Sequence, residues 1–199
     1  MLNRLKDKRF RLEFIFSLIV LIAVLISLAS FLVFIEQREG TVLNDPLLAL
    51  FPPINLTWLI FGLIYLGILT AVFYLFKNPD RLLFAIQLYA LMVFTRIIAM
   101  YILPLNPPAN MIPLIDPLVE FFGTGKTLSK DLFFSGHTAT LFILFLTAEN
   151  KIVKTIFFIC TIIVGISVIL QHVHYSIDVM AALFFTYSLY SFLKYLKSA

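Results

Sequence analysis

The sequence predicts an all-α integral membrane protein, a bundle of six transmembrane helices. Of its 199 residues, 61% are hydrophobic and 13% are charged, and the mean hydropathy is +1.02, which is outside the range of ordinary soluble proteins. About twenty consecutive apolar residues cross a hydrocarbon core that is about 30 Å thick. Six such runs lie near residues 13–35, 56–76, 82–103, 132–148, 152–171 and 175–193.

The basic residues predict the orientation of the bundle. Residues 1–12 form a basic tail and residues 13–199 the membrane domain, and six spans place both termini on one side. Of the 15 lysines and arginines, eleven lie at the termini and in the 77–81 and 149–154 turns, against three on the opposite loops. By the positive-inside rule the eleven are cytoplasmic. The net charge of +4 therefore reflects topology, and we do not expect nucleic acid as a partner.

The first apolar run follows a basic flank, as a signal peptide would. It is about 20 residues long and continues past the small residues at 27–30, so we expect an uncleaved anchor. The compact length without soluble tails favours a bacterial cytoplasmic membrane.

Two outer loops are irregular. Prolines break the 36–55 segment, whose role the sequence does not indicate. The 104–131 loop is long and proline-rich, as lids and binding loops often are. Its residues 123–127 resemble the end of a nucleotide P-loop, but Glu120 stands where the first glycine is required, so we predict no nucleotide cofactor and no other cofactor.

The third run contains Arg96. A cation inside a span costs about 2.5–3.5 kcal/mol on insertion scales and usually faces a protein-lined cavity. Counting residues back from Pro104 places Arg96 about 12 Å below the outer surface. Its side chain could snorkel outward, but we expect its planar donor fork to bind a phosphate.

Residues 131–138, Asp-Leu-Phe-Phe-Ser-Gly-His-Thr, open the fourth run. Ser135 is a candidate helix N-cap, and Gly136 permits close backbone approach. The first free amides of the helix would then point at an anion, with His137 among them. We therefore expect Ser135 and Gly136 to bind substrate and His137 to be catalytic, although a single histidine at a span end is more often interfacial.

Residues 172–179, His-Val-His-Tyr-Ser-Ile-Asp-Val, stand at the start of the sixth run. In a helix, His174 and Asp178 form an i, i+4 pair on one face. The carboxylate can keep one ring nitrogen protonated and leave the other free to attack or to take a proton.

Topology brings Arg96, His137, His174 and Asp178 to similar depths on the outer side. This set suits in-line displacement at phosphorus: His174 attacks, and protonated His137 donates to the departing oxygen. Arg96 and the amides near Gly136 would hold the phosphoryl oxygens. The coupled histidines predict a bell-shaped pH profile.

Both histidine motifs resemble the signature motifs of the sphingomyelin synthase family, a branch of the lipid phosphate phosphatase (PAP2) superfamily. The stretch from Arg96 to Tyr101 resembles the family's third-span motif more loosely, and the likeness covers about residues 90–190. The resemblance implies a PAP2-like six-span fold and a substrate-binding role for this stretch, including Tyr101.

The resemblance also implies a catalytic triad of His137, His174 and Asp178 that faces the lumen or the exterior. We predict no metal ion at this site. The implied reaction transfers a phospho-head-group from a phospholipid donor to a lipid alcohol acceptor, commonly phosphocholine from phosphatidylcholine to ceramide.

Some positions depart from these patterns. The cysteine and glycine that usually precede the first-motif aspartate are Ser129 and Lys130, and the family's N-terminal proline-rich motif is not evident. Compared with the phosphatases proper, Ser167 is present, but the adjacent arginine is Val168 and the Lys-x6-Arg-Pro element is missing. The departures from the phosphatase pattern favour the synthase branch.

Three alternatives stay open. In a lipid phosphate phosphatase, water would capture the same intermediate. A non-catalytic transporter or scaffold could use the polar cavity for anionic lipid. A metal site could be built on His172, His174 and Asp178.

Overall fold

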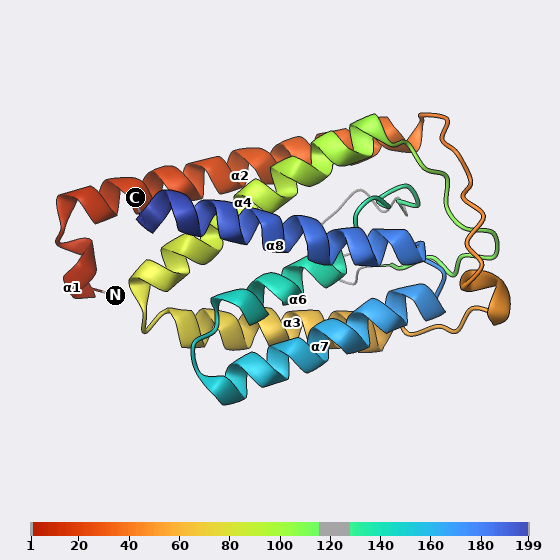
Figure 1. Cartoon of the computed structure of the whole chain (residues 1–199). Helices are drawn as coiled ribbons and strands as arrows, with labels where there is room; N and C mark the ends of the chain where they lie inside the picture. Colours follow the sequence, from red (N-terminus) through yellow and green to blue (C-terminus); the bar gives the residue numbers. More distant parts are fainter. Residues whose placement is uncertain (1, 116–127, 199) are drawn as a thin grey trace.

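The computed structural model describes residues 2–115 and 128–198. Residues 123–127, which resemble the end of a P-loop in sequence, lie outside the described residues. Every long element is a helix (Figure 1). The helices are α1 (Leu2–Leu5), α2 (Lys8–Glu36), η1 (Leu48–Leu50), α3 (Thr57–Leu75), α4 (Pro79–Ile102), α6 (Gly136–Thr147), α7 (Lys151–Leu170) and α8 (Ser176–Ser198). Because α2 already begins at Lys8, part of the basic N-terminal segment is helical.

Five of the helices, α2, α3, α4, α7 and α8, are long and apolar enough to cross a membrane. They coincide with five of the six predicted spans. The sixth, α6, has only 12 residues and starts at Gly136, four residues after the start of the predicted run. At about 1.5 Å per residue it is about 18 Å long, which is shorter than a hydrocarbon core.

The late start of α6 is set by contacts with distant parts of the chain. The backbone N–H of Ser135 donates to the Asp178 carbonyl, and the Phe134 carbonyl accepts from Arg96. These groups are committed to other parts of the bundle, so the chain enters the helix only after Ser135. Apolar composition alone did not reveal this, because residues 132–134 are as hydrophobic as the helix that follows.

The short helix α6 is central, and it packs against α3, α4, α7 and α8. In Figure 1 it lies among these longer helices, while α2 runs along α4 at the edge. Side chains of α2 such as Phe16 and Ile26 are largely exposed, as lipid contacts would be. The polar residues of the α6 N-terminus are therefore surrounded by the other helices.

Both termini lie at one end of the bundle, and the 36–55 and 104–115 segments lie at the other (Figure 1). The two segments pair at Thr41, whose N–H donates to Pro104 over 3.0 Å and whose carbonyl accepts from Asn106 over 3.0 Å. Gly40 is required there, since a Cβ atom would lie 2.6 Å from the Leu105 carbonyl carbon. The 36–55 segment thus forms part of the structure at the end of the bundle opposite the two termini.

The connection between α7 and α8 is a tight turn at this same end. His172 adopts a left-handed backbone with φ of 58°, which non-glycine residues adopt only when the surroundings enforce it. The buried side chain of Gln171 anchors the turn by accepting from Leu56 N–H and donating to Thr57 and to the Ile112 carbonyl. The turn presents His174 just before α8 begins.

Candidate active site

The two histidine motifs meet inside the bundle. His137 lies in the first turn of α6, and His174 lies in the turn before α8. Their ring centroids are 5.8 Å apart and their planes are inclined by 64°. His137 also packs edge-on against Phe61 of α3, with centroids 5.9 Å apart. One phosphorus-sized centre can therefore approach both rings.

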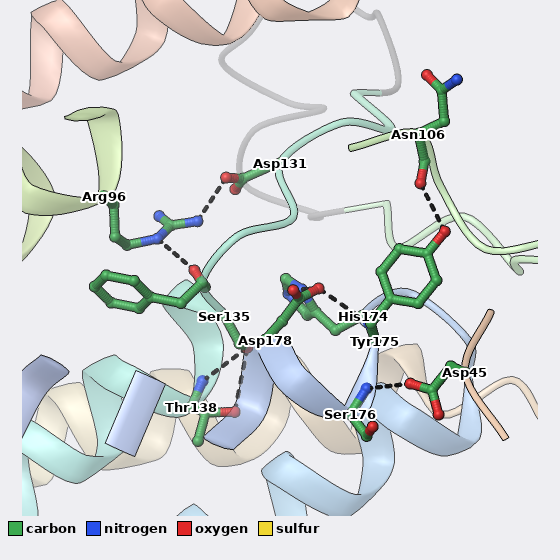
Figure 2. Close-up of polar contacts among 11 residues, drawn as sticks. Asp45, Arg96, Asn106, Asp131, Ser135, Thr138, His174, Tyr175, Ser176 and Asp178 are labelled. Carbon is green, nitrogen blue, oxygen red and sulfur yellow. Dashed lines mark hydrogen bonds and ion pairs between the residues drawn. The ribbon is translucent and has the colours of Figure 1, made fainter. Parts of the chain in front are cut away.

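Asp178 orients His174. Its Oδ2 lies 3.3 Å from His174 Nδ1 and accepts the backbone N–H of Tyr175 over 3.0 Å (Figure 2). Both side chains are fully buried. A carboxylate can only accept, so this contact keeps the proton on Nδ1 and leaves the Nε2 lone pair free. The predicted i, i+4 geometry brings the pair together, although His174 itself precedes the helix.

Ser135 ties the two motifs to each other. As the N-cap of α6, its Oγ accepts from the N–H of Thr138 over 3.4 Å and from the Thr138 hydroxyl over 3.2 Å. Its own N–H donates to the Asp178 carbonyl over 3.1 Å. The predicted cap is present, and the start of α6 is fixed against the first turn of α8. A substrate contact by Ser135 stays a prediction.

Arg96 points into the bundle and is 4% exposed, so it does not snorkel outward. Its Nε donates to the Phe134 carbonyl over 2.7 Å, and its Nη2 forms an ion pair with Asp131 over 2.6 Å (Figure 2). These two bonds fix the plane of the guanidinium.

The third nitrogen of that guanidinium lies over the α6 N-terminus. A Cβ atom on Gly136 would stand 2.6 Å from Arg96 Nη1 and 2.8 Å from its Cζ. Only glycine lets the cation approach the first turn so closely. The N-terminal amides of α6 and a guanidinium thus converge at one place, which favours an anion.

Asp131 is a site residue whose role the sequence did not indicate. Its burial by itself raises the pKa of the carboxyl. The Arg96 charge, together with the His137 and His174 rings when these are protonated, outweighs burial and lowers that pKa from its ordinary value. The carboxyl therefore carries a negative charge beside the histidines. Its position in the first motif, six residues before His137, was the only signal that could have pointed to it.

Tyr101 lies apart from this cluster. Its ring is 58% exposed and faces the Arg38 guanidinium, 5.1 Å from the ring centroid, and its carbonyl accepts from Arg38 over 2.6 Å. The structure therefore does not bring Tyr101 to the histidines, and its contact with substrate stays a prediction.

His172 faces a different environment from His174. It is 4% exposed, packs edge-on against Phe51 with centroids 5.5 Å apart, and lines a cavity of about 630 Å³ under the 42–53 segment. Within residues 2–115 and 128–198, neither of its ring nitrogens has a hydrogen-bond partner, and no three histidine, cysteine or acidic side chains converge on a possible metal position.

Three hydrogen bonds from the 36–55 and 104–115 segments hold the second motif. Asp45 accepts the Ser176 N–H over 2.6 Å at the start of α8, and the Tyr175 hydroxyl donates to the Asn106 carbonyl over 2.9 Å (Figure 2). The same hydroxyl accepts from Leu43 N–H over 3.2 Å. Burial raises the pKa of the Tyr175 hydroxyl, which keeps its proton available for donation.

The arrangement combines one imidazole with a free nitrogen, a second imidazole beside it, and a cation over a helix N-terminus. Such a set can attack an electrophilic phosphorus atom, move a proton and hold phosphoryl oxygens.

Comparison with known proteins agrees with this chemistry. Residues 130–196, about a third of the chain, match the family model described as PAP2 superfamily C-terminal. The match includes Asp131, His137, His174 and Asp178, while Arg96 lies before it. No curated protein matches the chain. The matched part of the chain is thus related to the PAP2 superfamily, whose members are phosphatases and phosphotransferases.

Proposed function

We propose that the protein is a membrane lipid phosphotransferase of the sphingomyelin synthase type, which moves a phospho-head-group from a phospholipid to a lipid alcohol. The observation that carries the proposal is the pair of adjacent imidazoles, His137 and His174, with a buried carboxylate that orients His174. Two nitrogens in different protonation states are what a two-step displacement at phosphorus needs.

In the first step, Nε2 of His174 attacks the phosphorus of the donor phospholipid. The N–P bond forms as the bond between phosphorus and the glycerol oxygen breaks. His137, in its protonated form, gives its proton to that oxygen, and diacylglycerol leaves. Asp178 stabilises the positive charge that develops on the His174 ring.

In the second step, the now neutral His137 takes the proton of the acceptor hydroxyl. The acceptor oxygen attacks phosphorus, the N–P bond breaks, and the new phospholipid leaves with His174 restored. Arg96 and the first amides of α6 hold the phosphoryl oxygens in both steps, since charge redistributes over them. Asp131 and the Phe134 carbonyl keep the guanidinium in place for this role.

The experiment supplies the purified full chain with phospholipids labelled at phosphorus and with a fluorescent ceramide or diacylglycerol. Transfer produces a lipid that carries both labels. Release of water-soluble head-group phosphate, or of labelled inorganic phosphate from phosphatidate, without a doubly labelled lipid would instead identify a hydrolase, because water would then be the acceptor.

The matched control is His174→Asn, in which the side chain keeps a similar size and loses the nucleophile. We expect no product from this variant at an unchanged melting temperature. Full activity in His174→Asn would overturn the proposal. Lipid transport or scaffolding without any turnover in the wild type would support the non-catalytic alternative, and loss of activity in chelator would support a metal site.

A further inference from the structure

Glu36 occupies a position that helix stability does not explain. It is the last residue of α2, where the C-terminal end of the helix dipole disfavours a negative charge. Its carboxylate instead accepts bonds from a segment 93 residues later in the chain. The hydrogen bonds that Glu36 accepts from this distant segment therefore explain its position.

Three donors of residues 129 and 130 converge on this one carboxylate. The Ser129 N–H donates to Oε2 over 2.9 Å, the Ser129 hydroxyl donates to Oε1, and the Lys130 N–H donates to Oε2 over 3.1 Å. The Lys130 ammonium adds a bond to the Arg38 carbonyl, just beyond α2. The C-terminal end of α2 is thus hydrogen-bonded to the backbone immediately before Asp131.

Residues 129 and 130 lead directly to the place where Arg96 meets the N-terminus of α6. Asp131 is the next residue, and its carboxylate pairs with Arg96 Nη2 over 2.6 Å. Asp131 and the Phe134 carbonyl are the two anchors that hold the guanidinium over Gly136. If residues 129 and 130 move, one of the two anchors of Arg96 moves with them.

We infer that Glu36 is a positioning residue for the phosphoryl group, acting through residues 129–131 on the orientation of Arg96. The inference rests on the proposed function, because that function makes a phosphoryl group the ligand of Arg96. Glu36, the last residue of α2, thus influences the rate of the reaction, although α2 otherwise packs mainly against α4.

The most informative substitution is Glu36→Gln. It keeps the size of the side chain but removes its charge and leaves one acceptor oxygen for the three donors. Glu39→Gln is the matched control, since Glu39 is exposed and lies three residues after Glu36. Ser129→Ala is the milder second variant, which removes one donor and keeps the carboxylate.

The first test is a double-mutant cycle on kcat with Asp131→Asn, because a merely structural role would not couple the two sites. We expect Glu36→Gln alone to lower kcat about tenfold at nearly constant KM, and to have no further effect once Asp131 is replaced. Ser129→Ala should lower kcat about two- to threefold. Independent, multiplying effects of Glu36→Gln and Asp131→Asn, or equal rates in Glu36→Gln and Glu39→Gln, would overturn the inference.

The second test measures binding of inorganic phosphate to the full chain by calorimetry, with no turnover involved. We expect wild type and Glu39→Gln to bind equally and Glu36→Gln to bind several-fold more weakly, at unchanged melting temperature. If the wild type neither binds phosphate nor processes lipid, the proposed function fails and the inference fails with it. If the wild type does both and Glu36→Gln matches it, the inference alone fails.

Discussion

The rings of His137 and His174 lie edge to face with their centroids 5.8 Å apart, although 37 residues separate them in the chain. Two features of the backbone bring the rings together. The Ser135 N–H donates to the Asp178 carbonyl, which holds the start of α6 against α8. In addition, α6 is short and begins inside the bundle, where the other helices surround it.

Gly136→Ala should lower kcat by about 10² to 10³, as loss of an oxyanion donor does. The added Cβ would stand 2.6 Å from Arg96 Nη1, so the guanidinium must leave the α6 N-terminus. Steady-state kinetics with labelled phospholipid checks this. Gly62→Ala is the control, since its Cβ meets nothing within 4 Å and the activity should stay at the wild-type level.

Asp178→Asn should lower kcat by about 10² with little change in fold. An asparagine carbonyl at the position of Oδ2 can still accept from the Tyr175 N–H and from His174 Nδ1, since both contacts are made to that one oxygen. The variant carries no negative charge, however, and cannot stabilise the positive charge that develops on the His174 ring. Asp80→Asn, at an exposed pair with Arg4, should leave the activity unchanged. Equal activity in both variants would refute the role of the Asp178 charge.

The pH profile of kcat/KM should be bell-shaped, because one imidazole must be neutral while the other is protonated. Asp131 does not supply the acid limb. Its pKa is lowered from the ordinary value of 3.8, mainly by Arg96 against the opposing effect of burial, so the carboxyl stays ionised throughout pH 5–9.

Asp131→Asn should move the acid limb to lower pH, because its negative charge no longer stabilises the protonated form of the neighbouring rings. Initial rates measured from pH 5 to pH 9 test both statements. A flat wild-type profile, or an acid limb that moves to higher pH in the variant, would contradict them.

Tyr175→Phe should destabilise the folded protein by about 1–3 kcal/mol, because the Leu43 N–H and the Asn106 carbonyl both lose their partner. Thermal unfolding in detergent measures the change. Tyr187→Phe, at a position where the ring is 57% exposed, provides the comparison and should leave the melting temperature unchanged.

The sequence predicted those parts of the fold and site that depend on local pattern. Five long apolar runs became helices, and the i, i+4 spacing of His174 and Asp178 became a contact. The N-cap at Ser135 was also predictable, because serine before a helical run is a local signal.

The remaining features depend on long-range contacts. The start of α6 is set by bonds to Asp178 and Arg96 that no hydropathy window contains. Glu36 contacts Ser129 just before the first histidine motif, and Asp45 contacts Ser176 in the second. These pairs are far apart in the chain, so no local pattern indicates them. The exposed position of Tyr101 could not be foreseen either, since a motif match places a residue in a family pattern but not on a face of the bundle.

The most direct test of the account is the covalent intermediate. The full chain is mixed briefly with phospholipids labelled at phosphorus, quenched in alkali and mapped by mass spectrometry of its peptides. The account predicts phosphoryl label on His174 in the wild type, and none in His174→Asn. Turnover without label on His174, or label on His137 in its place, would contradict it.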